Sequence, residues 1–340
     1  MCSFAKDIGI DLGTASVLVY VKGKGVVLNE PSVVAIDKNT GKLLKVGGDA
    51  QAMLGRTPGN IVAIRPLREG VISDYDMTER MLREFLHKVT GGFQLFKPRV
   101  IICVPSGITE VEERAVVDAG IQAGARRVYL IEEPVAAALG AGLDLSVPRG
   151  RFILDMGGGT TDIAVLSLNG IVCKKSIKLA GRKLDEAIVR CVRTDRNVLI
   201  GEKMAERIKI EVGSVFYTED KEMEAKGRNL HTGLPEKFVI RTSDIYDALM
   251  EQVMQIVTAV QQILEITPPE LSADIWEDGL IMTGGGALLH GLGDLISQHA
   301  KIKVRLAEHP VECVAIGTAL SFSKLDELYD GFVTPSTHTH

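Results

Sequence analysis

Short apolar segments rich in β-branched residues recur along the chain, and most of them end at a turn signal. The first, residues 7–20, is interrupted by Gly9 and Gly13 and predicts a strand, a tight turn and a second strand. Residues 26–37 continue in strand-like composition. The same composition predicts buried strands over residues 99–105, 127–131, 151–155, 162–168 and 280–282.

Between these segments the apolar residues recur at helical spacing. Met81, Phe85 and Val89 predict a helix over residues 77–89 that Asp74 or Asp76 could cap. Similar patterns predict helices over residues 110–123, 134–139, 184–193, 203–212, 243–266, 288–299 and 314–325. Strands that alternate with helices in this way predict an α/β protein whose sheets are covered by helices.

Local signals predict how several of these elements begin and end. Asn169-Gly170 is a strong type I′ hairpin signal. Ser243 or Asp244 is expected to cap the long helix that the prolines at 268–269 end. Residues 216–240 are polar, and we expect them to be irregular.

Composition and charge exclude several classes of protein. The 340 residues are long enough for two domains. With 39 basic and 44 acidic residues the net charge is −5, which argues against a protein that binds nucleic acid through a basic surface. No apolar stretch is long enough to span a membrane, and we expect no targeting leader. Five scattered cysteines without a CxxC pair disfavour a disulfide scaffold or zinc ribbon and favour a reducing compartment.

Glycine is enriched, at 35 of 340 residues, and its clusters coincide with the candidate chemistry. The first cluster is Asp11-Leu12-Gly13-Thr14, at the predicted tight turn. A phosphate needs backbone N–H donors at close approach, which a glycine permits because no Cβ blocks the ligand. Thr14 adds a hydroxyl donor, and Asp11 could orient a magnesium ion through its water shell. A plain hairpin with a satisfied aspartate is the competing interpretation.

The second cluster repeats the first with more glycine. Asp155 precedes three glycines and the threonines Thr160 and Thr161. Three glycines in a strand pattern weaken a sheet unless a ligand or another backbone must come close. We therefore expect two hairpins that face each other and clamp phosphates and one Mg2+ ion, with Asp11 and Asp155 repeating one role. A glycine-rich bulge is the alternative.

Two further motifs fit a nucleotide site. Residues 284–286 are glycines between a predicted strand and helix, where a base or ribose could lie on backbone. Glu133 precedes Pro134 at a predicted helix start, where the helix dipole favours a carboxylate for structural reasons alone. In an ATPase such a carboxylate could orient or deprotonate the attacking water. Neither a P-loop nor a GxGxxG fingerprint occurs.

In their order and spacing these motifs resemble the superfamily of actins, sugar kinases and heat-shock chaperone ATPases. Residues 6–325 as a whole resemble the MreB/Mbl-type bacterial actins. The resemblance implies an actin-like α/β fold with two duplicated lobes around a nucleotide cleft, each lobe carrying a smaller subdomain. The implied bounds are residues 1–147 plus 320–335 for lobe I, with its subdomain at about 30–75, and 148–319 for lobe II, with its subdomain at about 181–243.

The resemblance also implies roles for single residues. Glu133 would position the attacking water, assisted by Thr160 or Thr161. Asp11 and Asp155 would hold Mg2+, mainly through water. The residues implied to bind ATP or ADP are Asp11, Gly13, Thr14, Ala15, Asp155, Gly157, Gly158, Gly159, Thr160, Glu206, Lys209, Gly284, Gly285, Gly286 and Leu288.

Members of the resembled family form paired protofilaments on the inner face of the cytoplasmic membrane. The resemblance therefore implies a weak ATPase that polymerises with itself, lies in the cytoplasm at that membrane, and works with membrane proteins of cell-wall elongation to maintain rod shape. Phe93, Leu95 and Phe96, in a turn-rich loop, are the candidate membrane contact, although such side chains could equally fold into the core. No nucleic-acid partner is expected.

Two other functions use the same fold. A sugar-type kinase needs a catalytic aspartate aimed at a substrate hydroxyl, and no residue can be assigned to that role. A chaperone ATPase needs an additional substrate-binding domain, for which 340 residues leave no room. The polymerising ATPase is therefore the preferred hypothesis, and the kinase is the alternative.

Overall fold

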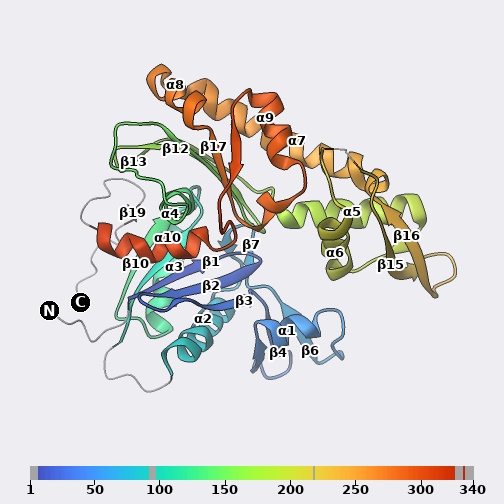
Figure 1. The fold of residues 1–340 in the computed structure, drawn as a ribbon. Helices are drawn as coiled ribbons and strands as arrows, with labels where there is room; N and C mark the ends of the chain where they lie inside the picture. Colours follow the sequence, from blue (N-terminus) through green and yellow to red (C-terminus); the bar gives the residue numbers. More distant parts are fainter. Residues whose placement is uncertain (1–6, 92–96, 217–218, 326–331, 334–340) are drawn as a thin grey trace.

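The computed structural model describes residues 7–91, 97–216, 219–325 and 332–333 (Figure 1). A six-stranded sheet has the order β19-β10-β9-β1-β2-β3. Its strands are β1 (Asp7–Leu12), β2 (Ser16–Val21), β3 (Gly25–Pro31), β9 (Arg99–Val104), β10 (Arg127–Glu132) and β19 (Phe332–Val333). β1 pairs antiparallel with β2 and parallel with β9, so the first hairpin leads into a parallel sheet.

A five-stranded sheet repeats this arrangement, in the order β13-β12-β11-β17-β18. Its strands are β11 (Arg151–Met156), β12 (Thr161–Ser167), β13 (Gly170–Ile177), β17 (Leu280–Thr283) and β18 (Val304–Leu306). β11 pairs antiparallel with β12 and parallel with β17, as β1 does with β2 and β9. The predicted repetition of a glycine-turned hairpin is therefore present. We call these two sheets the β1 sheet and the β11 sheet.

Helices cover both sheets. Those near the β1 sheet are α2 (Tyr75–Thr90), α3 (Glu110–Gln122), α4 (Glu133–Gly140) and α10 (Cys313–Leu320). Those near the β11 sheet are α5 (Gly181–Arg196), α6 (Glu202–Val212), α7 (Thr242–Ile266), α8 (Pro269–Asp278) and α9 (Leu292–Ala300). Asp74 caps α2 by accepting from the Met77 N–H at 3.1 Å, and Thr109 forms the predicted capping box with Glu112 at the start of α3.

Helices α4 and α10 join the two sheets. Their small apolar residues form one cluster with Ile101 of the β1 sheet and Ile153 of the β11 sheet. Glycines let the helices touch: a Cβ added to Gly317 would lie 1.7 Å from the Ala136 carbonyl oxygen. We call this contact the α4–α10 joint.

Two small sheets lie to the same side of the large sheets (Figure 1). One contains β4 (Val34–Asp37), β5 (Leu43–Val46) and β6 (Ile61–Ile64) beside α1 (Gly48–Met53). The other contains β14 (Val198–Leu199), β15 (Glu222–Asn229) and β16 (Pro235–Arg241). They fall within the segments expected to be small subdomains, whose exact bounds remain a prediction. A two-stranded ribbon of β7 (Leu67–Arg68) and β8 (Val71–Ile72) lies near the first hairpin.

The prediction of irregular structure over residues 216–240 is wrong, since β15 and β16 form an antiparallel hairpin there. Alternate residues, among them Met223, Ala225 and Phe238, are buried beneath charged residues on the opposite face. Apolar and charged residues alternate along β15, but one of the buried positions is the small Ala225. The segment therefore has too few large apolar residues for the alternation to predict a strand.

Several local details also differ from expectation. The hairpin after β12 has Leu168 and Asn169 at positive φ, one residue earlier than predicted, and Ser167 pairs with Gly170. Helix α7 begins at Thr242, and Asp244 accepts from the Arg241 N–H at 2.8 Å from within the first turn. The helix predicted over residues 288–299 is α9, which starts only at Leu292, and the end of the helix predicted over 314–325 is a 3-10 turn at Ser321–Lys324. Helix α8 was not expected.

No helix in the described ranges is long and apolar enough to cross a bilayer. The candidate membrane contact, Phe93, Leu95 and Phe96, lies outside the described residues.

Candidate functional site

The first hairpin, between β1 and β2, is shaped by backbone contacts. A Cβ on Gly13 would lie 2.7 Å from the Ser16 carbonyl oxygen, so glycine permits the bend. The Ser32 hydroxyl donates to the Gly13 carbonyl at 2.5 Å. Buried Thr14 accepts from the Gly70 N–H at 2.9 Å, which fixes its hydroxyl beneath the turn.

The second hairpin, between β11 and β12, closes when the Gly157 N–H donates to the Thr160 carbonyl at 3.0 Å. A Cβ on Gly157 would meet one atom within 4 Å, the Thr160 oxygen at 3.6 Å, so this position faces open space. The first half of the second hairpin therefore has room for a ligand.

The two hairpins touch each other. A Cβ on Gly158 would lie 2.4 Å from the Ala15 Cβ, and a Cβ on Gly159 would lie 2.5 Å from the Thr14 hydroxyl oxygen. Glycine is thus required at both positions for the turns to approach. The structure brings together the two turns that the sequence predicted to face each other.

Four carboxyl groups gather where the hairpins meet. Burial raises the pKa of Asp11 to about 8, and the charge of Asp155 adds to the rise. Burial also raises the pKa of Asp155 to about 7, although a 2.6 Å hydrogen bond from the Thr283 hydroxyl opposes it. Glu133 and Asp162, the other two, are buried as well. In the absence of a cation this cluster favours protonated carboxyls.

Glu133 is the first residue of α4, directly after β10. Its pKa is raised well above the ordinary value, first by burial and then by the charges of Asp162, Asp155 and Asp11. Its Oε2 lies 3.4 Å from the Thr160 hydroxyl. A nearby cation would favour the ionised form that can accept a proton from water.

The two threonines that the sequence left as alternatives have different surroundings. Thr160 bonds Glu133, whereas the fully buried Thr161 donates its hydroxyl to the Leu179 carbonyl at 2.6 Å. Successive residues here point in opposite directions. The geometry therefore favours Thr160 as the assistant of Glu133 and gives Thr161 a structural contact.

The third glycine run packs against the end of β11. Gly284 has φ +84°, and a Cβ there would lie 2.3 Å from the Met156 carbonyl oxygen, while one on Gly286 would lie 2.5 Å from the Met156 side chain. A Cβ on Gly285 would meet nothing within 4 Å, and Leu288 is 56% exposed. The run thus has one face packed on the second hairpin's strand and one face open.

Lys209 and Glu206 lie on one helix with different contacts. Lys209 Nζ donates to the Gly181 carbonyl at 2.9 Å and pairs with Asp185 at 2.8 Å, whereas Glu206 is exposed. Gly181 in turn donates to the Gly157 carbonyl at 3.2 Å. The ammonium of Lys209 therefore holds the segment that supports the second hairpin.

Sequence reasoning left three residues of this site without a role. Thr283 bonds Asp155, and Asp162 accepts from the Ser106 N–H at 2.9 Å while its second oxygen is buried without a described hydrogen-bond partner. Arg182 donates to the Thr14 carbonyl. Thr283 and Asp162 belong to the glycine motifs and could have been found from strand alternation, whereas nothing in the local pattern marks Arg182.

The carboxyl cluster fits a divalent cation. Asp11, Asp155, Glu133 and Asp162 lie together with their pKa values raised, and none of the causes of these shifts is a neighbouring cationic side chain. Within the described ranges no three His, Cys, Asp or Glu side chains are placed to hold a metal directly. That arrangement suits Mg2+, which keeps several waters and uses few protein carboxylates.

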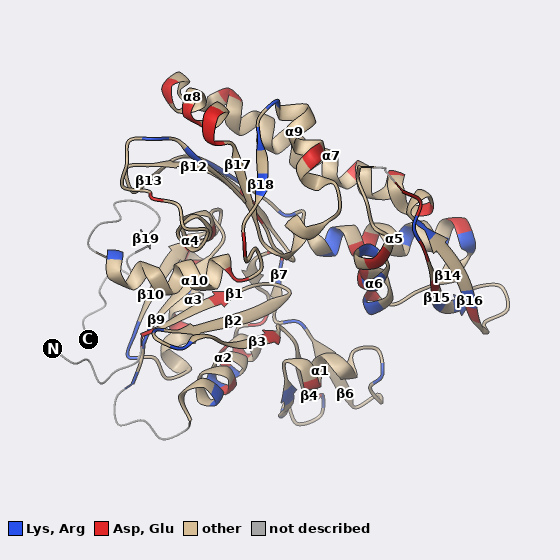
Figure 2. Ribbon diagram, in the orientation of Figure 1, with Lys and Arg blue, Asp and Glu red and all other residues tan. Residues whose placement is uncertain are grey.

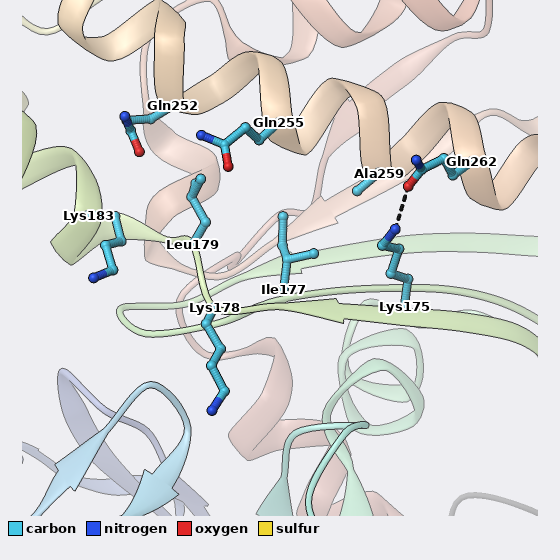
Figure 3. A pocket seen from close by; sticks show the side chains of 9 residues that line it. All are labelled: Lys175, Ile177, Lys178, Leu179, Lys183, Gln252, Gln255, Ala259 and Gln262. Carbon is cyan, nitrogen blue, oxygen red and sulfur yellow. Dashed lines mark hydrogen bonds between the residues drawn. The ribbon is translucent and has the colours of Figure 1, made fainter.

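A separate groove of about 380 Å3 lies between the end of β13 and α7 (Figure 3). Lys175 donates to Gln262 across it, and Leu179 lines it with its side chain while its carbonyl bonds Thr161. Lys178 points away from α7. The groove is therefore on the outer side of the strand that supports the second hairpin.

The family model for the MreB/Mbl protein matches residues 5–330. This chain belongs to the MreB/Mbl protein family. It is 52% identical to the cell shape-determining protein Mbl of Bacillus subtilis over 326 residues, covering 96% of this chain and 98% of that one. It is 49% identical to the cell shape-determining protein MreB of Escherichia coli over 329 residues, covering 95% of each.

Solved structures confirm the actin-like α/β fold of this MreB/Mbl chain. MreB5 of Spiroplasma citri bound to AMPPNP superposes with a TM-score of 0.90 at 36% identity, covering 95% of this chain and 98% of that one. The MamK double helical filament superposes with a TM-score of 0.80 at 20% identity, covering 94% and 99%, and shows the fold alone. The family match does not support the sugar-kinase alternative.

Proposed function

We propose that this MreB/Mbl chain binds ATP or ADP with Mg2+ between its two glycine hairpins, hydrolyses ATP slowly, and polymerises into filaments that organise cell-wall synthesis and rod shape. The observation that carries the proposal is the contact of the two hairpins beside a cluster of buried carboxyls. The AMPPNP and ADP bound to Spiroplasma MreB5, and the names of the curated relatives, support it.

In this proposal the hairpins hold the phosphates. Backbone N–H groups of residues 13–15 and 158–159 would face them. Gly157, whose own N–H closes the turn, would leave the space that a phosphate fills, because it has no Cβ there. Asp11 and Asp155 would hold Mg2+ through water, and the ion would offset the negative charge of the phosphates. Gly285 and Leu288 would offer the open face on which the adenosine lies, and Glu206 would face its purine from α6.

Glu133 and Thr160 would hold the attacking water, with Glu133 as the proton acceptor. Attack forms a bond from water oxygen to the terminal phosphorus and breaks that phosphorus's bond to the bridging oxygen, which leaves ADP and inorganic phosphate. The position of Glu133 at the start of α4 ties this proton acceptor to the joint between the sheets.

Polymerisation separates this function from that of a small-molecule kinase. Light scattering of the purified chain with Mg-ATP should rise above a critical protein concentration. In the same preparation, Glu133→Ala should keep its affinity for ATP and slow phosphate release at least tenfold. Absence of assembly at every concentration, with turnover that a sugar stimulates, would overturn the proposal.

We also propose that the filaments lie on the inner face of the cytoplasmic membrane, beside membrane proteins of wall elongation. The apolar residues Phe93, Leu95 and Phe96 motivate this step. A single pair of such side chains contributes only a few kcal/mol, so a polymer is needed for firm binding. Leu95→Ala with Phe96→Ala should reduce co-sedimentation of the polymer with liposomes, and unchanged co-sedimentation would remove the loop from the proposal.

A further inference from the structure

The start of α5 contacts both hairpins. The Arg182 N–H donates to the Gly158 carbonyl of the second hairpin at 3.0 Å, and the Arg182 guanidinium donates to the Thr14 carbonyl of the first. One residue thus bonds two turns that are 144 positions apart in the chain.

Charged groups from both halves surround this bond. Arg65, just before β7, pairs with Glu202 at the start of α6, with 2.8 Å between Nη2 and Oε2. Lys183, beside Arg182, lies 3.4 Å from Glu69. Residues 65–70 follow the small sheet that contains β4. Both ion pairs connect this segment to helices α5 and α6, which lie on the side of the β11 sheet. Figure 2 shows charges of both signs on these two helices.

The same segment is fitted tightly to the hairpins. Glu69 and Gly70 have φ of +49° and +79°, which aims the Gly70 N–H at the Thr14 hydroxyl. A Cβ on Gly70 would lie 2.7 Å from Pro105 and 2.8 Å from Thr160. The segment therefore cannot move away without releasing Thr14.

We propose that Arg182, with the ion pairs Arg65–Glu202 and Lys183–Glu69, forms a latch that holds the two hairpins together and sets the rate at which a bound nucleotide leaves. The inference rests on the proposed function, since it concerns the same site. Arg182 is a positioning residue in it. It acts through the Thr14 and Gly158 carbonyls.

The chemistry of the contact suits a latch. A guanidinium carries several N–H donors in a rigid plane, so it can keep a carbonyl bond while charged neighbours hold it in place. Burial and the charge of Arg65 lower the pKa of Arg182 to about 10, which still leaves it protonated at neutral pH. When the hairpins separate, this partly buried cation loses its carbonyl partner, and that loss opposes opening.

The first test measures release of a fluorescent ATP analogue after a chase with unlabelled ATP. Arg182→Ala should release it at least tenfold faster than the native chain, while the melting temperature changes little. The release rate of Arg182→Lys should lie between those of the native chain and Arg182→Ala, because an ammonium keeps the charge and can donate to a carbonyl but lacks the rigid planar fork. Arg190→Ala, an exposed arginine on the same helix, is the matched control and should release at the native rate.

The second test is a charge exchange that leaves Arg182 in place. Arg65→Glu and Glu202→Arg should each speed release of the ATP analogue several-fold. The double variant restores the ion pair with its charges exchanged, so at least half of this increase in the release rate should disappear. Release from Arg182→Ala at the native rate, or a double variant no slower than either single one, would overturn the latch. If the native chain binds no Mg-ATP, the proposed function fails instead, so the two failures are distinguishable.

Discussion

The two sheets meet in two places of opposite character. At the α4–α10 joint the contact is apolar and close, with Gly317 against the Ala136 carbonyl. At the hairpins the contact is also close, with Gly158 against Ala15, but polar groups accompany it: Arg182, the Arg65–Glu202 pair, three buried carboxyls and the half-buried Asp11. Close apolar packing tolerates almost no change in shape, whereas hydrogen bonds and exposed ion pairs can be exchanged one at a time. We therefore expect the joint to act as a fixed support and the hairpin side to open around a ligand.

The largest effect is expected at the joint. Gly317→Ala places a methyl group 1.7 Å from the Ala136 carbonyl oxygen, so α10 must shift away from α4. Overpacking typically costs about 1–3 kcal/mol and occasionally more, and this site belongs at the upper end because a backbone oxygen is the obstacle. Urea denaturation should show that loss in the free energy of unfolding, or the variant should fail to fold.

Gly59→Ala is the control, because an added Cβ there meets nothing within 4 Å. It should unfold at the native urea concentration. A Gly317→Ala variant with native stability would show that the joint is not tightly packed and would remove the contrast between the two regions.

A second prediction concerns Glu133, which belongs to both regions. Its raised pKa means that the folded, nucleotide-free chain holds a proton that the unfolded chain releases. As pH rises above the ordinary pKa of a glutamate, the free energy of unfolding of the native chain should therefore fall relative to that of Glu133→Gln, by at most about 1.4 kcal/mol per pH unit. The fall should end when pH passes the raised pKa of Glu133 in the folded chain. Hydrolysis should be slowed in the same variant.

Urea denaturation of the nucleotide-free proteins between pH 5 and pH 8 measures this difference, with Glu110→Gln as an exposed control on α3. If the free energy of unfolding depends on pH equally in the native chain and in Glu133→Gln, the pKa of the Glu133 carboxyl is not raised by its surroundings.

The smallest effect on stability is expected at the edge of the hairpin side. Arg65→Ala removes an ion pair whose Glu202 side chain is 74% exposed, so the free energy of unfolding should change by less than about 1 kcal/mol. A loss as large as that at Gly317, in the same urea titration, would mean that both regions support the fold equally.

The parts of this structure that could be predicted from sequence are those in which a local pattern has one physical cause. The two glycine hairpins could be predicted because glycine interrupts a strand pattern at Gly13 and again at residues 157–159, each time after an aspartate, and the repetition favours a ligand over a plain turn or bulge. The β15–β16 hairpin was missed because the small Ala225 takes a buried position among charged residues, so the alternation is faint.

The remaining site residues depend on tertiary contacts. The role of Arg182 comes from Thr14, which lies 168 positions away, and no window of sequence contains both. Sequence could not separate Thr160 from Thr161 as the partner of Glu133. The distinction depends on which hydroxyl points toward Glu133, and that is known only from the three-dimensional structure. The joint was missed because Gly140 and Gly317 look like ordinary helix glycines until α4 and α10 are placed together.

The affinity of the Gly157→Ala variant for Mg-ATP tests most directly whether the phosphates lie between the hairpins. An added Cβ would meet only the Thr160 oxygen, at 3.6 Å, so the fold should be unaffected. It would occupy the space in which we place a phosphate. We expect the dissociation constant to rise at least tenfold at an unchanged melting temperature. Native affinity in a folded Gly157→Ala variant would contradict a phosphate site at this hairpin.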